Sequence, residues 1–367
     1  MKYKRQVFIY AYNKCNFGDD LFVHAILRRY PFVKFYFRGD YESAQRIQTE
    51  KNIKRVHDDS WLIRQVYNIR PSLAARMKMH KEKQCDAVVY IGGSLFIEYK
   101  NWETILTWWR YTADNRKFFV IGANFGPWHT EEYRRQSGEI FRKMQDVCFR
   151  DKYSKELFSE IPTVRYAPDI LLGYPMPEEE VDPKQAFVSV INCESKGEGD
   201  NQLKPFDRSY TEGMADLVQR LLDQGWKVVL SSFCRAEGDE EGVRKIIDKL
   251  ADTSSVEVKN YDGFNTDEIL RSIAASAIVY GTRFHAAVLG FAARRPVVPL
   301  IYSDKTKNIL EDMQFSGESF DIRKPSDDFG ERLAAIAGAS EIQYLNHMDQ
   351  YAKQSEEHFK KLDDFLR

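Results

Sequence analysis

Short runs of β-branched and aromatic residues alternate along this chain with longer stretches whose apolar residues recur at helical spacing. A strand, a crossover helix and a second strand place both strands in the same direction, which builds a parallel sheet covered by helices on both faces. The alternation runs through two series, the first starting at 7–13 and the second at 186–192. The sequence therefore predicts an α/β fold with two doubly wound, Rossmann-like domains.

The two series are separated by a proline-rich segment at 174–183, YPMPEEEVDP, of the kind that links domains. We predict an N-terminal domain over 1–176, a C-terminal domain over 177–338, and a helix over 339–367 that packs across their junction. Ligands of doubly wound sheets bind outside the carboxyl ends of the strands. Two such domains facing a cleft therefore direct attention to the loops that follow strands.

Charge and cysteine content narrow the class of protein. The 54 Lys and Arg residues balance 55 Asp and Glu residues, for a formal net charge of −1, which is not the basic footprint of a nucleic-acid-binding protein. The five cysteines are scattered singly, with no spacing suited to zinc, so we expect a reducing compartment and no metal site. The longest uncharged apolar runs are too short to span a membrane, and no signal peptide is evident, so we expect a cytoplasmic protein.

A basic segment at 61–83 carries six Lys or Arg residues against one Glu. Two interpretations stay open. The segment is either an exposed crossover helix broken at Pro71, or a helix that approaches anionic lipid or a diphosphate-bearing acceptor. The second interpretation would bring the protein into peripheral contact with the inner face of the membrane.

Glycines and polar residues follow the predicted strands of the first domain. In the loop NKCNFGDD, Asp19 serves either as a helix N-cap or as a proton acceptor for a sugar hydroxyl, with Asn16 as its hydrogen-bonding partner. The backbone N–H groups of Gly92, Gly93 and Ser94, which follow the strand 87–91, suit an oxyanion or a phosphate.

Arg150 follows another predicted strand and precedes a helix start at Asp151. A cation at a helix N-terminus is unfavourable unless an anion accompanies it. Either Asp151 or Glu156 supplies that anion in a plain salt bridge, or a ligand phosphate or carboxylate does.

The stretch 280–302 places Arg283 and His285 at the mouth of a short helix. A buried stripe at helical spacing and Thr282 as N-cap would put both side chains beside unpaired backbone N–H groups, where an anion is held. A bound anion would favour the protonated imidazole and make His285 a usable acid. The alternative is a satisfied core histidine beside a surface arginine. Lys305 follows the next strand and faces the same cleft.

Taken in order, the motifs NFGDD, GGSLF, FRDKYS, APD, GTRFHA and YSDK resemble those of the polysaccharide pyruvyl transferase family, over about residues 6–313. The resemblance implies a glycosyltransferase-B-type fold and a ketal-forming transferase without a cofactor. Such an enzyme transfers pyruvate from phosphoenolpyruvate to two hydroxyls of a sugar in a bacterial exopolysaccharide or capsular polysaccharide precursor, and releases phosphate. The implied partners are phosphoenolpyruvate, on the side of the C-terminal domain, and a lipid-linked glycan acceptor on the N-terminal side, but no nucleic acid.

By this resemblance, Arg150, Arg283 and His285 match the donor site, with His285 as the catalytic acid. We expect Asp19 as a second catalytic residue, and further substrate contacts from Lys305, Asn16, Gly92, Gly93 and Ser94. Two positions depart from the family pattern: the run IGGS lacks a third glycine, and the strand 186–192 ends in Asn192 where many relatives have arginine.

Two other classes of function stay open. A nucleotide-sugar glycosyltransferase would share the two-domain cleft, although its second domain should present an acidic residue to the ribose, and no convincing acidic pair stands at that spacing. A glycan-binding protein without catalysis would not need Arg150, Arg283 and His285. An activity assay separates the three classes. A pyruvyl transferase turns over phosphoenolpyruvate, a glycosyltransferase turns over a UDP- or GDP-sugar, and a glycan-binding protein turns over neither.

Overall fold

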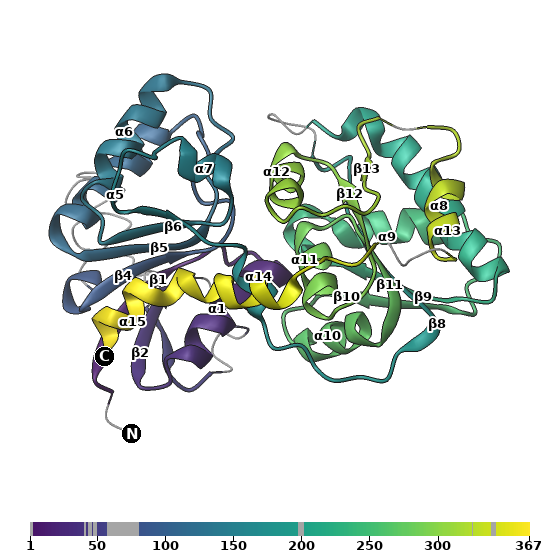
Figure 1. The fold of residues 1–367 in the computed structure, drawn as a ribbon, viewed down its shortest axis with the longest axis horizontal. Coiled ribbons are helices and arrows are strands. Elements are labelled where there is room, and N and C mark those ends of the chain that lie inside the picture. Colours follow the sequence, from purple (N-terminus) through teal and green to yellow (C-terminus); the bar gives the residue numbers. More distant parts are fainter. Residues whose placement is uncertain are drawn as a thin grey trace. The chain divides into compact units, whose positions relative to one another are not determined.

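The computed structural model describes residues 3–39, 42, 46, 50–56, 81–196, 202–324, 326–338 and 343–367. Apart from 81–83, the basic segment 61–83 lies outside the described residues. The chain forms two compact units (Figure 1). The first unit comprises Met1–Asn13, Asp19–Ala167 and Glu356–Arg367, and the second comprises Lys14–Gly18 and Pro168–Ser355. The chain thus passes from the first unit to the second after Ala167, earlier than the predicted boundary at 176. The C-terminal segment is divided between the units after Ser355.

The first unit is built on a parallel sheet whose described strands follow the order β3-β2-β1-β4-β5-β6-β7. The order reverses between β1 and β4, which is the arrangement of a doubly wound sheet. The strands are β1 (Arg5–Tyr10), β2 (Val33–Arg38), β3 (Ile53–Val56), β4 (Ala87–Ile91), β5 (Lys117–Ala123), β6 (Asp146–Phe149) and β7 (Val164–Tyr166).

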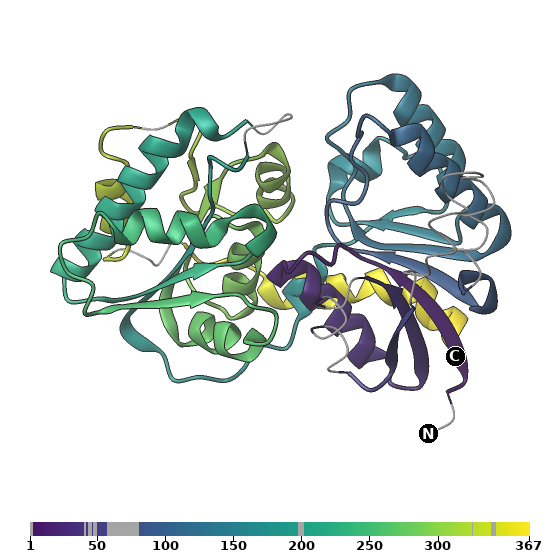
Figure 2. The same cartoon turned by 180° about the vertical axis from the view of Figure 1, so that it is seen from behind.

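Helices cover both faces of this sheet. On one face, α5 (Trp102–Asn115) and α6 (Glu131–Phe141) pack against each other and against Phe118 and Val120 of β5. The opposite face carries the C-terminal segment, drawn in yellow in Figure 2, where the ring of Phe365 lies 5.6 Å from that of Phe119. The other helical elements of this unit are α1 (Phe17–Arg29), which belongs to it from Asp19 onward, η1 (Glu82–Gln84), α7 (Lys152–Glu156), η6 (Glu356–Phe359) and α15 (Lys360–Leu366).

The second unit repeats the plan with a parallel sheet of order β10-β9-β8-β11-β12-β13 in the described chain. Burial on both faces explains its uninterrupted apolar runs, such as VVPLI in β12. The strands are β8 (Asp182–Val190), β9 (Lys227–Ser232), β10 (Val256–Asn260), β11 (Ser276–Gly281), β12 (Val297–Ile301) and β13 (Phe320–Asp321).

Helices α8 (Asp207–Asp223), α9 (Asp239–Ile247) and α13 (Phe329–Ile336) enclose one core of this second sheet, whereas α10 (Thr266–Ala275) and α11 (Phe284–Ala292) contact each other and the sheet. The remaining elements are η2 (Ile170–Gly173), η3 (Lys204–Phe206), η4 (Arg235–Glu237), α12 (Asp304–Asp312) and α14 (Met348–Ser355). Two parallel sheets with covering helices confirm the predicted α/β class.

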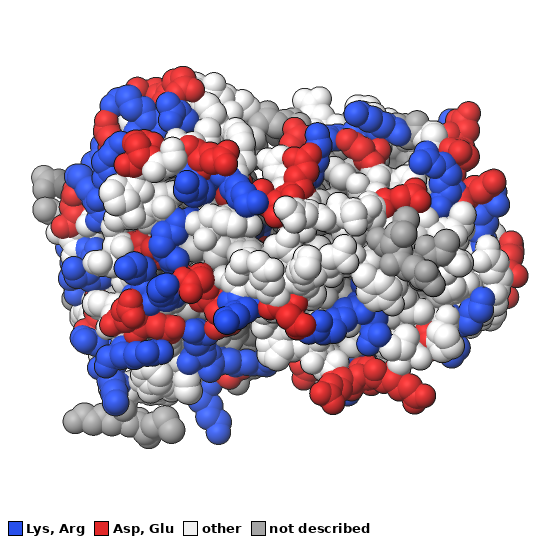
Figure 3. Space-filling model, viewed as in Figure 1, with Lys and Arg blue, Asp and Glu red and all other residues white. Residues whose placement is uncertain are grey.

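On the face shown in Figure 3, basic and acidic side chains are interspersed. Among the described residues, no helix is long and apolar enough to cross a membrane.

Candidate functional site

In the first unit, four of the predicted site residues gather where β1, β4 and β6 end. A Cβ atom added to Gly93 would lie 2.4 Å from Nη2 of Arg150, and one added to Gly92 would lie 3.4 Å from Oδ1 of Asp19. The glycine loop therefore runs directly against both side chains. A side chain at position 93 would displace the guanidinium, which is the physical reason for glycine there.

Arg150 is almost fully buried, with 2% of its surface exposed. Its Nη2 donates to Oδ1 of Asn124 at 3.0 Å, and Asn124 in turn donates its backbone N–H to Gly93 O at 2.8 Å. Asp151 uses its carboxylate to cap α7, accepting from the backbone N and the hydroxyl of Ser154 at 2.8 and 2.9 Å. Asn124 thus orients the guanidinium of Arg150. Beyond its place at a strand end, no sequence pattern marks this amide as a partner of Arg150.

In the second unit, Arg283 lies at the start of α11 and directs its guanidinium at two carboxylates. Nε and Nη2 donate to the two oxygens of Asp239 at 2.6 and 2.5 Å, and Nη1 donates to Glu237 at 2.8 Å. Arg283 is 6% exposed and Asp239 is fully buried. Burial alone would lower the pKa of Arg283, but Asp239 and Glu237 raise it well above its ordinary value. The fork geometry makes this a strong charge-assisted pair.

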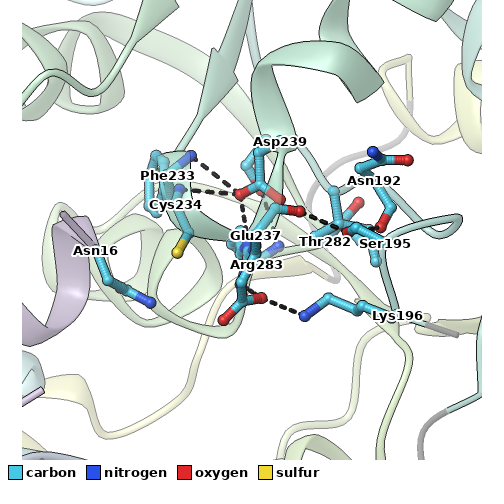
Figure 4. Close-up of polar contacts among 12 residues, drawn as sticks. Asn16, Asn192, Ser195, Lys196, Phe233, Cys234, Glu237, Asp239, Thr282 and Arg283 are labelled. Carbon is cyan, nitrogen blue, oxygen red and sulfur yellow. Dashed lines mark hydrogen bonds and ion pairs between the residues drawn. The ribbon is translucent and has the colours of Figure 1, made fainter. Parts of the chain in front are cut away.

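Glu237 joins Arg283 to Lys196, whose Nζ donates to the same carboxylate (Figure 4). Burial would raise the pKa of Glu237, but Arg283 and Lys196 outweigh it and hold that pKa well below its usual value. Two cations therefore balance two carboxylates in this network. An incoming anion meets little net positive charge from Arg283 itself.

Asp239 also fixes the loop that follows β9. Its Oδ2 accepts the backbone N–H groups of Phe233 and Cys234 at 3.3 and 3.0 Å. Arg283 is thereby connected to a loop far away in sequence. The acids of the run CRAEGDEEG at 234–242, which follows β9, are the signal that sequence reasoning missed.

His285 is the second residue of α11 and is partly exposed. The helix begins at Phe284 with Arg283 as its N-cap, so the predicted cap at Thr282 was wrong. The Thr282 hydroxyl instead pairs with the buried Tyr210 hydroxyl at 3.0 Å. A Cβ atom added to Gly18 would lie 1.7 Å from Nδ1 of His285. The glycine of the NFGDD motif is therefore required by the close approach of the imidazole.

The segment Lys14–Gly18 belongs to the second unit through its backbone. Phe17 N donates to Phe233 O at 2.8 Å, and Asn16 forms an isolated antiparallel bridge with Cys234. The Asn16 side chain accepts from Gly18 N at 3.2 Å, which turns the chain into α1. Asn16, Gly18 and His285 are thus held together with the loop after β9.

The remaining predicted residues lie at strand ends as expected. Ser94 is exposed beside Gly93 in the first unit. Lys305 is partly exposed in the first turn of α12 in the second unit, after β12.

Two buried cysteines of the second unit, Cys193 and Cys234, follow β8 and β9. Burial raises the pKa values of both thiols to about 12, so neither thiol is a nucleophile at neutral pH.

Comparison with known proteins gives a family and a fold. A family model described as polysaccharide pyruvyl transferase matches residues 16–304. The amylovoran biosynthesis protein AmsJ of Erwinia amylovora is 21% identical over 279 residues, which are 70% of this chain and 66% of that protein. The match thus spans just under two thirds of this relative's length.

Among solved structures, HepE of Anabaena in complex with UDP superposes with a TM-score of 0.59 at 10% identity, covering 100% of this chain and 99% of HepE. The UDP-GlcNAc 2-epimerase of Neisseria meningitidis bound to UDP-GlcNAc gives 0.59 at 10% identity, covering 98% and 99%. At such low identity the likeness establishes the fold alone. That fold is of the glycosyltransferase-B type, as predicted.

Proposed function

The chain belongs to the polysaccharide pyruvyl transferase family, and we propose that it forms a pyruvate ketal on a sugar of a surface-polysaccharide precursor, with phosphoenolpyruvate as donor. One observation carries the proposal: the family match runs from residue 16 to residue 304 and includes both groups of strand-end residues. The first group comprises Asp19, Gly92, Gly93 and Arg150, and the second comprises Asn16, Arg283 and His285. The similarity to AmsJ, which is named for amylovoran biosynthesis, supports a polysaccharide product.

The proposed chemistry uses groups that the chain supplies. An acid protonates the methylene carbon of phosphoenolpyruvate, which makes the adjacent carbon electrophilic, and a sugar hydroxyl adds to that carbon. The carbon–oxygen bond to phosphate then breaks with its electron pair, and a second hydroxyl of the sugar completes the ketal. The sugar hydroxyls lose two protons in these steps. One proton restores the acid that protonated the methylene carbon, and the other leaves on phosphate.

We assign the acid to His285 and the acceptance of a hydroxyl proton to Asp19. An imidazole suits general acid catalysis because its pKa lies near neutral pH, and such an acid contributes roughly 10²- to 10⁴-fold to the rate. Arg150 and Lys305 supply positive charge for the carboxylate and phosphate of the donor. Asn16, Ser94 and the N–H groups of Gly92 and Gly93 provide neutral donors.

Arg283 has a positioning role in this proposal. All three of its guanidinium nitrogens donate to Asp239 or Glu237, so its charge holds the loop after β9 and the start of the helix that carries His285. Arg283 could bind the donor directly only if one of its hydrogen bonds to Asp239 or Glu237 broke. The two roles differ in kinetics: loss of a direct contact raises KM for phosphoenolpyruvate, whereas loss of positioning lowers kcat.

Phosphate release tests the proposal. The protein is incubated with phosphoenolpyruvate and a panel of nitrophenyl and lipid-linked sugars, and in parallel with UDP- and GDP-sugars. We expect phosphate release that requires both phosphoenolpyruvate and a sugar with two suitably placed hydroxyls. Turnover of a nucleotide sugar without use of phosphoenolpyruvate would identify a glycosyltransferase instead, and turnover of neither would leave a glycan-binding protein.

A comparison within the same panel addresses the acceptor. We propose a lipid-linked oligosaccharide, modified in the cytoplasm before export. A lower KM for the lipid-linked sugar than for its soluble counterpart supports this choice, and equal values contradict it.

A further inference from the structure

Three aromatic side chains stand on consecutive strand-end loops of the first unit. Tyr99 follows β4, Trp128 follows β5, and Tyr153 lies in α7 after β6. Since β4, β5 and β6 are neighbours in the sheet, their carboxyl-end loops are neighbours as well. Tyr99 and Tyr153 are 52% and 45% exposed, and Trp128 is partly exposed. Single exposed aromatics are common, but a group at the ligand-binding edge of a sheet indicates an interaction site.

Hydrogen bonds hold these three loops together. The Trp128 indole Nε1 donates to the Tyr153 hydroxyl at 3.3 Å. Glu98, which precedes Tyr99, donates its backbone N–H to Pro127 O at 2.9 Å, and its carboxylate accepts from the backbone N of Thr130 at 2.8 Å. The Thr130 hydroxyl donates to the same carboxylate at 2.6 Å. The loops that carry the rings are therefore braced against one another, so little loop ordering remains to be done on binding.

The chemistry of this surface suits a sugar. A pyranose has a face of C–H bonds, which packs on an aromatic ring, and a rim of hydroxyls, which needs hydrogen-bonding groups at the edge of that ring. Tyrosine and tryptophan offer both, because each has an apolar body and a polar tip. The exposed Ser94 and the glycines Gly92 and Gly93 begin the loop after β4 that also carries Tyr99.

We propose that Tyr99, Trp128 and Tyr153 form an aromatic platform on which sugar rings of the acceptor glycan stack. The platform lies on the loops that also carry Asn124, the partner of Arg150. The inference rests on the proposed function for the statement that the glycan is a substrate. The binding of saccharide by these three rings does not depend on the donor.

Saccharide binding is measured without phosphoenolpyruvate, by saturation-transfer NMR on the full chain. The probes are soluble oligosaccharides with terminal glucose, galactose or mannose. Tyr99→Ala and Tyr153→Ala should each weaken binding about three- to tenfold, which is the free energy of one aromatic contact expressed as a ratio of dissociation constants. Tyr153→Phe keeps the ring but loses the hydroxyl that accepts from Trp128, so it should weaken binding less than Tyr153→Ala does. Tyr344→Ala removes a tyrosine of matched exposure, 46%, from the second unit and should change nothing.

Three results would overturn the platform: no binding of any probe by the unaltered chain, equal binding by the alanine variants, or a change in their oligomeric state, which would mark the face as a protein interface. Thermal unfolding of each variant checks that the fold is intact. Phosphate release from phosphoenolpyruvate is assayed separately on the same proteins. Saccharide binding that needs Tyr99 and Tyr153 supports the platform even if that release is absent.

Discussion

Replacing Asp239 by alanine should destabilise the second unit more than any surface charge deletion. The substitution leaves the buried Arg283 with Glu237 as its remaining carboxylate, and it removes the acceptor of the Phe233 and Cys234 amides. Removing one partner of a buried ion pair costs about 3–5 kcal/mol, because the other charge stays buried with less compensation. For a unit of this size, such a loss lowers Tm by roughly 6–20 °C.

A matched control stands near the end of the helix that Asp239 begins. Asp248 also pairs with an arginine, Arg244, at 3.1 Å, but both side chains are about 60% exposed. Exposed pairs contribute roughly 0–1 kcal/mol, so Asp248→Ala should be nearly neutral. Urea unfolding gives both differences, and hydrogen exchange at the Phe233 and Cys234 amides shows whether the loop is released. Equal destabilisation by the two variants would refute the structural role of the buried pair.

Four further changes test the site. His285→Ala should lower kcat roughly 10²- to 10⁴-fold with little change in phosphoenolpyruvate binding, as measured by steady-state kinetics and calorimetry; unchanged kcat would remove the acid role. Gly18→Ala and Gly93→Ala should each abolish most turnover, because the new Cβ collides with His285 or Arg150, whereas Gly338→Ala, with its nearest atom at 3.7 Å, should be active. Glu237 has a lowered pKa, so its contribution to stability is present above its unfolded pKa of about 4.3 and is lost as the pH falls below that value. Urea midpoints between neutral pH and about pH 3 should therefore fall less steeply for Glu237→Gln than for the unaltered chain, and identical slopes would contradict the pairing.

The strands that the sequence predicted are those with long apolar runs. The strand 87–91 coincides with β4, and the strand 186–192 overlaps β8 (Asp182–Val190). Strands β3 and β13 were not predicted, because four and two residues carry too little pattern to stand out from a loop. The predicted single C-terminal helix is divided between α14 and α15, with a 3-10 turn at Glu356–Phe359.

The direction of a side chain was harder to predict than its position. The sequence places Arg283 at a helix start, but its partner Asp239 lies 44 residues earlier in the chain, and only the neighbouring positions of β9, β8 and β11 bring the two into contact. The same holds for Gly18 and His285, whose contact no local pattern records. Local patterns thus predict which loops carry polar residues, while strand order decides which of those residues meet.

The most direct test of the proposed ketal chemistry is to run the reaction in deuterium oxide and examine the product by NMR. Protonation of the methylene carbon by a solvent-exchanged acid predicts a pyruvyl methyl group that carries a single deuterium. A product that retains the vinyl group, or a glycosyl product without any methyl signal, would contradict the account.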